Sequence, residues 1–263
     1  YPPTRELLKH SGLTFAPVEV DSEGVIVSQG IALAPQARAA IVTPAHQSPL
    51  SVTLSLTRRQ ALLDWAERHQ RWIVEDDYDG EYRYVSRPLP ALKSLDRHGR
   101  VLYAGTFSKV MFPGIRLAYL VAPAALVQRF EIVNRVLGNG IPGLTQALVS
   151  AFMTEGHFAR HIQRMRRLYA ERRNATAAGL AKVFGPGMPI DPQPGGMHLL
   201  VRMKGRHTDR ELARRMLSNG LYAHALSRWA TAASCGSGLL MSFTNIESQD
   251  RAEQLGRRIL ELM

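Results

Sequence analysis

The sequence holds a single cysteine, Cys235, in 263 residues. One cysteine excludes a disulfide framework and any metal site built from several cysteines, and we expect no metal site. No stretch approaches ~18 uninterrupted apolar residues, so no membrane-spanning helix and no membrane partner are expected. The start lacks the pattern of a signal peptide, which makes the cytoplasm the expected location.

Acidic residues are also scarce. The chain has 22 Asp and Glu against 33 Lys and Arg, a formal net charge of +11, and nearly all of the excess is arginine. Such a charge attracts polyanions, but arginine-rich genome composition gives the same signal, so nucleic-acid contact by this segment stays open. The chain starts at Tyr1-Pro2-Pro3 without Met, and we therefore expect a fragment or a processed product.

Short apolar runs alternate with helical patterns through the first two-thirds of the chain. Strands are expected at residues 39–43, 72–74, 101–104 and 117–121, and helices at 57–69, 126–136, 144–153 and 158–180. Continuous apolar strands separated by helices predict an α/β fold with a mainly parallel sheet and helices on both faces. Later strands (197–203, 239–243) and helices (209–217, 249–262) predict a smaller α+β unit. We expect a large domain over residues 1–180 and a small C-terminal domain over residues 181–263.

An acidic cluster directly follows the strand expected at residues 72–74. Residues 75–81 read EDDYDGE, but the carboxylate offsets do not fit an EF-hand calcium loop. Asp76 stands at the carboxyl end of an expected parallel strand, which is where open α/β sheets bind their ligands. This position favours a ligand-binding role over a solvated turn.

Lys109 lies in an unusual setting for a lysine. Residues 105–114 read GTFSKVMFPG, so we expect an amine surrounded by apolar residues, and a desolvated lysine becomes a nucleophile towards aldehydes. Arg116 can bind a phosphate, and Thr106 and Ser108 add hydroxyls. With Asp76, this set offers an amine for an imine, a cationic phosphate site and a carboxylate for a pyridinium nitrogen. Pyridoxal 5′-phosphate needs all three.

Several motifs together resemble one family. They are EDDYDGEYRY at 75–84, PALKSLD at 90–96, GTFSK at 105–109, PGIRL at 113–117, the TPAHQ stretch at 43–49, the helix at 58–66 and GGMHL at 195–199. In combination they are similar to MocR-type regulators of the GntR superfamily. These bacterial proteins join a winged helix-turn-helix DNA-binding domain to a fold-type I, aminotransferase-like domain that binds pyridoxal phosphate.

The resemblance implies a role for each site residue. Lys109 would be the catalytic lysine that forms the internal aldimine, Asp76 would pair with the pyridine nitrogen, and Tyr78 would reach the ring hydroxyl. The other expected cofactor contacts are with the phosphate (Arg116, Thr106 and Ser108), the side of the ring (His46 or Gln47) and the ring face (Tyr1).

The sequence departs from the family pattern in two places. The family's Pro-Thr-Gly reads Pro49-Leu50-Ser51 here, and residues 239–245 lack the arginine that holds a substrate carboxylate in aminotransferases. Arg228 and Arg202 are possible substitutes. By the same resemblance, we expect the DNA-binding domain, its linker and the opening of the large domain to lie outside this chain.

The expected function is therefore that of an effector domain. An amino-group ligand would displace Lys109 in an external aldimine, and the change would be transmitted to DNA. The alternatives are a working aminotransferase and a pseudo-enzyme that has lost the cofactor. We expect a homodimer for the full-length protein, because the helices at 126–136 and 144–153 are apolar on more than one face. For this segment we expect an altered dimer or an aggregation-prone monomer with weak cofactor binding.

Overall fold

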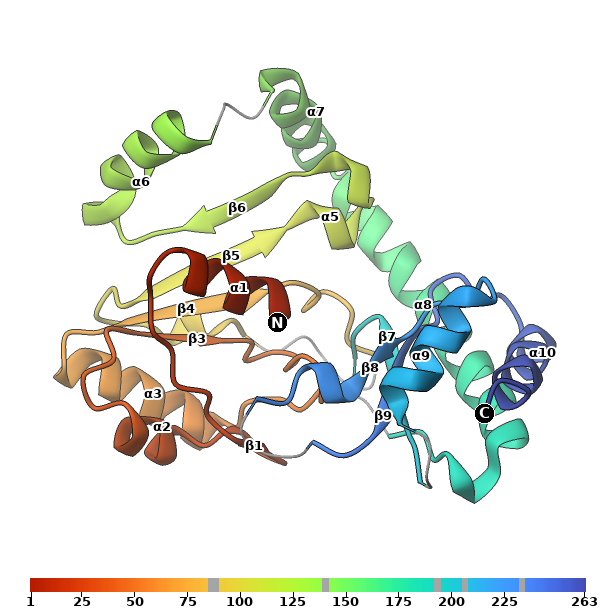
Figure 1. Cartoon of the computed structure of the whole chain (residues 1–263). Helices are drawn as coiled ribbons and strands as arrows, with labels where there is room; N and C mark the ends of the chain where they lie inside the picture. Colours follow the sequence, from red (N-terminus) through yellow and green to blue (C-terminus); the bar gives the residue numbers. More distant parts are fainter. Residues whose placement is uncertain (85–89, 139–141, 192–194, 205–207, 232–234) are drawn as a thin grey trace.

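The computed structural model describes residues 1–84, 90–138, 142–191, 195–204, 208–231 and 235–263. Two sheets organise this part of the chain, and the long helix α8 (His157–Phe184) passes from one to the other (Figure 1). A short hairpin, β1 (Val20–Asp21) with β2 (Gly24–Val25), forms a third sheet. The expected α/β fold class, with a mainly parallel sheet and a smaller C-terminal α+β unit, is confirmed.

The first sheet has the strand order β3-β4-β5-β6. Its strands are β3 (Ala39–Val42), β4 (Trp72–Asp77), β5 (Val101–Thr106) and β6 (Ala118–Val121). The first three run parallel, whereas β6 pairs with β5 in the antiparallel direction. A parallel pair needs a crossover of a dozen or more residues, and the connection 107–117 is too short for one.

One face of this sheet is covered by helices α2 (Val27–Leu33), α3 (Leu56–Arg68) and α4 (Leu92–Leu95). Ser55 caps α3 by accepting a hydrogen bond from the Arg58 amide, so the helix begins at Leu56. The helices and strands share one apolar core, which includes Leu62, Trp65, Ile73 and Val101. On the opposite face, Ile41 of β3 is 46% exposed.

The edge beside β6 is built from short and exposed elements. The chain forms α5 (Phe107–Val110) and the 3₁₀ turn η1 (Pro113–Ile115) before β6, then α6 (Ala124–Leu137) and α7 (Gly143–Thr154) after it. These two helices lie beyond the β6 edge in Figure 1. All four residues of β6 are exposed, and α6 has no buried residue in the described part of the chain.

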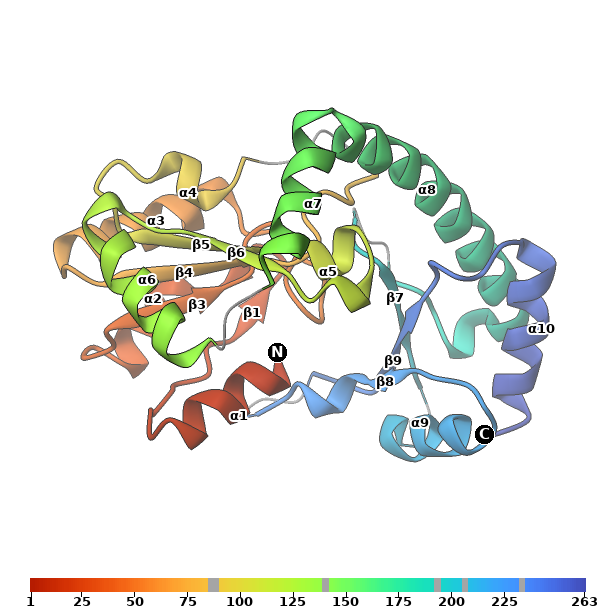
Figure 2. The ribbon, with the colours of Figure 1, turned by 90° about the horizontal axis from the view of Figure 1, so that it is seen from above.

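The second sheet is antiparallel, with the order β7-β9-β8. Its strands are β7 (His198–Arg202), β8 (His224–Ala225) and β9 (Gly238–Ser242). Helix α9 (Asp209–Ser218) lies between β7 and β8 in the chain, the 3₁₀ turn η3 (Leu226–Arg228) follows β8, and helix α10 (Gln249–Leu260) follows β9. Helix α10 packs along the C-terminal half of α8, which ends at the turn η2 (Gly185–Gly187) (Figure 2). Leu180 and Phe184 of α8 belong to this second core, and the boundary expected at residue 180 stays a prediction.

Helix α1 (Pro2–His10) connects the two regions at the start of the chain. Its Arg5 donates hydrogen bonds to the carbonyl oxygens of Arg228 and Trp229, at the turn η3 of the second region. Among the described residues, no helix is both long enough and apolar enough to cross a membrane.

Candidate functional site

The expected site residues gather at one edge of the first sheet. Asp76 lies in β4, Thr106 is the last residue of β5, and His46 follows β3. Because these three strands run parallel, their carboxyl ends meet at the same edge. In the register of β4 and β5, Asp76 lies opposite Ala104, so the segment with Lys109 begins beside the acidic cluster.

Asp76 is a partly buried carboxylate without a protein hydrogen bond in the described part of the chain. Burial raises its pKa, the amino group of Tyr1 lowers it, and the neighbouring Asp77 and Asp79 raise it further. Asp77, by contrast, accepts a hydrogen bond from the Tyr103 hydroxyl at 2.8 Å and one from the Gly80 amide at 3.1 Å. Asp76 is therefore the carboxylate of this pair that is available to a cation.

Lys109 is exposed, so the expected desolvated amine is wrong for this chain. The single turn of α5 explains the difference: Phe107 and Val110 point into the core, at 8% and 2% exposure, and Lys109 points out of it. Burial lowers the pKa of His198 and of His224, and the charge of Lys109 adds to both shifts, so Lys109 lies within electrostatic range of the second sheet. Thr106 caps α5 by accepting a hydrogen bond from the Ser108 amide at 3.2 Å.

Arg116 lies at the end of the turn η1 with a left-handed backbone, φ 48° and ψ 37°. A non-glycine residue in this region is uncommon and costs conformational energy. Its side chain is exposed, and in the part that the structure describes it has neither a hydrogen bond nor an ion pair. Within the described residues, the guanidinium of Arg116, between β5 and β6, is therefore available to an anion.

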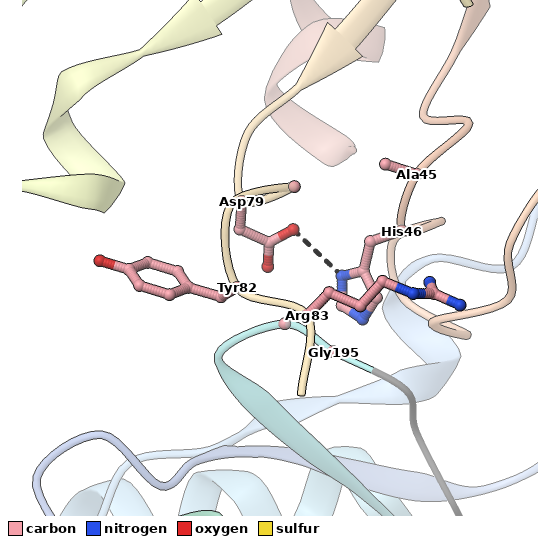
Figure 3. A pocket seen from close by; sticks show the side chains of 8 residues that line it. Ala45, His46, Asp79, Tyr82, Arg83 and Gly195 are labelled. Carbon is pink, nitrogen blue, oxygen red and sulfur yellow. Dashed lines mark ion pairs between the residues drawn. The ribbon is translucent and has the colours of Figure 1, made fainter. Parts of the chain in front are cut away.

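His46 and Tyr78 are in direct contact, together with Asp79. The Tyr78 hydroxyl donates to the His46 carbonyl oxygen at 3.0 Å and lies 3.0 Å from His46 Nδ1. The same nitrogen lies 3.2 Å from Asp79 Oδ1 (Figure 3). Burial raises the pKa of Tyr78, and the charge of Asp79 raises it further. Of the alternatives His46 and Gln47, His46 bonds to Tyr78, whereas the Gln47 side chain bonds to Ser48 and Leu50 of its own loop.

The remaining expected residues are less enclosed. The Tyr1 side chain is 65% exposed, although its amino group lies close enough to Asp76 to affect the pKa of that carboxyl. Arg202 is bound to Asp191 at 2.8 Å and to the Cys235 carbonyl oxygen at 2.9 Å, which occupies its guanidinium. Arg228 is exposed and lies near His224. Of the two arginines considered for a carboxylate, Arg228 is the more available.

Two site residues were not predicted from the sequence. His198 of β7 lies 5.5 Å from His46 between ring centroids, and burial, with the charge of His46 next, lowers its pKa to about 4. Asp79 is part of the acidic cluster, but its contact with His46 joins two loops far apart in the chain. The GGMH string at 195–198 was the one available signal for His198.

Comparisons with known proteins agree with this geometry. A family model described as aminotransferase class I and II matches residues 1–236. The probable rhizopine catabolism regulatory protein MocR of Rhizobium meliloti is 36% identical over 246 residues, 94% of this chain and 50% of that protein. The pyridoxine biosynthesis transcriptional regulator PdxR of Corynebacterium glutamicum is 32% identical over 243 residues, 92% of this chain and 52% of that protein.

A solved structure gives the same result for the fold. The α-aminoadipate aminotransferase LysN from Thermus thermophilus, complexed with N-(5′-phosphopyridoxyl)-L-leucine, has a TM-score of 0.84 at 25% identity, covering 95% of this chain and 66% of that one. The chain spans about half the length of the curated relatives it matches. The expected resemblance to the aminotransferase-like part of MocR-type regulators is confirmed, and the chain belongs to the aminotransferase class I and II family.

Proposed function

We propose that this chain is the effector domain of a MocR-type transcription regulator, which binds an amino-group ligand through pyridoxal phosphate held on Lys109. Membership of the family implies pyridoxal 5′-phosphate as the cofactor. The observation that carries the proposal is the set of groups at the carboxyl edge of the first sheet. An amine, a carboxylate and a guanidinium are there without a protein hydrogen bond among the described residues.

These groups fit the chemistry of the cofactor. When bound, pyridoxal phosphate supplies an aldehyde that reacts with amines and a protonated ring that withdraws electrons. The exposed Lys109 would hold the aldehyde carbon covalently, and Asp76 would keep a proton on the ring nitrogen by its negative charge. Tyr78 would face the ring hydroxyl, with His46 behind it. The phosphate would be held by Arg116, Thr106 and Ser108, and Tyr1 would cover the ring.

The exposure of Lys109 is consistent with exchange of amines. A ligand that carries an amino group can approach Lys109 from solvent and compete for the same carbon. Burial lowers the pKa of His198 and of His224 in the second sheet, so neither adds positive charge near Lys109 at neutral pH. Two uncharged imidazoles there would not repel a cationic ammonium ligand as it approaches.

The second candidate is an active aminotransferase, and the likeness to LysN favours it. An amino acid substrate needs a cation for its carboxylate. Arg202 is already occupied by Asp191, which leaves the exposed Arg228 as the candidate in the second region. A regulator needs only reversible binding, so the weakly defined carboxylate site favours regulation.

The regulatory role implies two partners for the complete protein. By similarity to its relatives, it would bind DNA through a helix-turn-helix domain outside this chain and would work in the cytoplasm. It would also form a homodimer, and the exposed apolar side chains of α6 and β6 support association along this edge. Val136 and Leu137 are 73% and 76% exposed.

The test is spectroscopic. Protein incubated with pyridoxal phosphate should absorb in the visible range, and borohydride should remove the band and fix the cofactor on the peptide that contains Lys109. Lys109→Ala should abolish the covalent link, while Lys204→Ala, at another exposed lysine, should leave it intact. Reduced cofactor on a different lysine would refute the assignment. An amine that changes the spectrum without forming a keto product supports a sensor, and steady product formation supports an aminotransferase.

A further inference from the structure

The cluster of Asp79, His46 and Tyr78 is more enclosed than the rest of the site. His46 is 5% exposed and Asp79 is 2% exposed. The cavity beside them, lined also by Tyr82, Arg83 and Gly195, has a volume of about 10 Å³. This is about the volume of one water molecule, far below the size of an organic ligand. These buried polar groups therefore act on their neighbours rather than on a ligand of their own.

The contacts define which nitrogen of His46 carries a proton. The Tyr78 hydroxyl gives its proton to the His46 carbonyl oxygen, so its oxygen faces Nδ1 as an acceptor. Asp79 Oδ1 lies 3.2 Å from the same Nδ1. Two acceptors around one nitrogen require an N–H there, because a lone pair would face the negative carboxylate. Neither carboxylate oxygen of Asp79 has an aligned hydrogen bond among the described residues, so Asp79 acts on the imidazole at 3.2 Å through its negative charge.

The second region closes the other side of the ring. Gly196 has φ +82°, and a Cβ added there would lie 2.0 Å from His46 Cε1 and 2.5 Å from Nε2. The Gly196 amide donates to the Tyr82 carbonyl oxygen at 2.7 Å, and the Tyr84 hydroxyl donates to the Gly196 carbonyl oxygen at 2.8 Å. The His46 ring is therefore held between Asp79 and a backbone that only glycine allows to come so near.

We propose that Asp79 is a positioning residue for the cofactor, which holds His46 protonated at Nδ1 and thereby fixes the hydroxyl of Tyr78 beside the ring of pyridoxal phosphate. The proposal rests on the proposed function, because Tyr78 must face the cofactor for Asp79 to influence it. Asp79 is 2% exposed, so it would act through His46 and Tyr78 and not by direct contact with the cofactor or the ligand. Among the described residues, the charged or titratable groups around His46 are Tyr78, Asp79 and His198, with Arg83 lining the same cavity, and the charge of Lys109 reaches His198.

The first test needs no cofactor. Long-range ¹H–¹⁵N correlation spectra of cofactor-free protein report which ring nitrogen of each histidine is protonated, and His46→Gln identifies the signals of His46. We expect Nδ1 of His46 to carry a proton in the wild type and this preference to disappear in Asp79→Asn, which keeps the side-chain shape. Glu75→Gln is the matched control, because Glu75 is a buried carboxylate of β4 that accepts from the amides of Leu92 and Lys93 instead. A neutral His46 protonated at Nε2 in the wild type would overturn the proposal.

The second test uses the loaded protein. In Asp79→Asn, the pH midpoint of the visible absorption band should move by about 0.5 to 1 pH unit, whereas Glu75→Gln should leave it in place. In a Tyr78→Phe background, Asp79→Asn should add no further change, because Asp79 acts through the Tyr78 hydroxyl. An additive change in the double variant, or an unchanged midpoint in Asp79→Asn, would overturn the role of Asp79. Protein that binds no cofactor would refute the proposed function instead, and the histidine spectra would still decide whether Asp79 controls His46.

Discussion

The two sheets differ in how completely they are covered. Strand β9 of the second sheet is buried at four of its five residues, whereas β6 of the first is exposed at all four. Helix α10 buries Ala252, Gly256 and Ile259 against its neighbours, and α6 exposes Val136 and Leu137. The same kind of apolar residue is therefore core in one region and surface in the other.

Helix capping separates the β6 edge from the rest of the molecule. Helices α9 and α10 are capped by Thr208 and Ser248, and α3 is capped by Ser55, while α6 and α7 begin after prolines with no side-chain cap. In the described part of the chain, every residue with positive φ in the second region is glycine, whereas the first region has Ser51, Gln70 and Arg116. Strained backbone and unsatisfied polar groups concentrate where a protein binds ligands. The comparison indicates that the second region is the better packed of the two and that the candidate site lies in the less completely packed one.

The largest expected difference in stability between the two regions concerns two phenylalanines. Phe243 is fully buried in the second core, and Phe130 of α6 is 37% exposed. Phe243→Ala should lower the free energy of unfolding by about 3–5 kcal/mol, because a large cavity forms in a closed core. Phe130→Ala should cost less than about 1 kcal/mol. Urea unfolding of both variants measures the difference, and similar losses would show that the β6 edge is as well packed as the second core.

A second test compares two carboxylates. Asp209 of the second region accepts hydrogen bonds from the Ser227 amide at 2.9 Å, the Ser227 hydroxyl at 2.6 Å and the Gly238 amide at 3.1 Å. Hydrogen bonds to a charged group contribute about 1.5–3 kcal/mol, so Asp209→Asn should destabilise the protein by about 2 kcal/mol at pH 7. Asp76→Asn should act in the opposite direction in cofactor-free protein, since no protein donor among the described residues stabilises that carboxylate.

The pH dependence of protein stability should show whether Asp76 stabilises or destabilises the fold. Burial raises the pKa of Asp76 above its value in the unfolded chain. Its contribution to stability is therefore fully present below the unfolded pKa and is lost as the pH rises through the folded pKa. Asp76→Asn should be more stable than the wild type at neutral pH, and the two should converge as the pH falls below about 4. Melting temperatures between about pH 3 and pH 7 test this, and a variant destabilised at neutral pH would contradict it.

Much of the fold was predictable because local signals were strong. Helix α3 was expected at 57–69 and spans Leu56–Arg68, since Ser55 is a good cap and the apolar stripe has helical spacing. The direction of β6 was not predictable, because an apolar run does not encode the direction of its partner. The helix α1 was missed, since its Pro2-Pro3 start and polar composition give little apolar periodicity.

The sequence predicted which residues belong to the site, but it did not predict how exposed they are or what they contact. The motif identified Asp76 and Lys109, but the exposure of Lys109 depends on how one turn of helix orients Phe107 and Val110. The contact of Asp79 with His46 depends on the pairing of β3 with β4, which brings together loops distant in sequence. Periodicity and spacing contain no information on such pairs.

The smallest expected effect concerns the turn after His46. Ser51, where the family has glycine, has φ 62° and is 2% exposed. A left-handed backbone costs a non-glycine residue about 1–2 kcal/mol, and glycine loses about 0.5–1 kcal/mol more entropy on folding, so Ser51→Gly should stabilise the protein by up to about 1 kcal/mol. Gln70→Gly, at φ 53° just beyond the end of α3, is the matched control for the same gain away from the site. The Ser51 hydroxyl lies 3.4 Å from His198 Nε2, so its loss should make the gain at Ser51 the smaller of the two. A loss of stability in Ser51→Gly alone would show that the contact with His198 outweighs the backbone strain, and that the first region is better satisfied here than its backbone indicates.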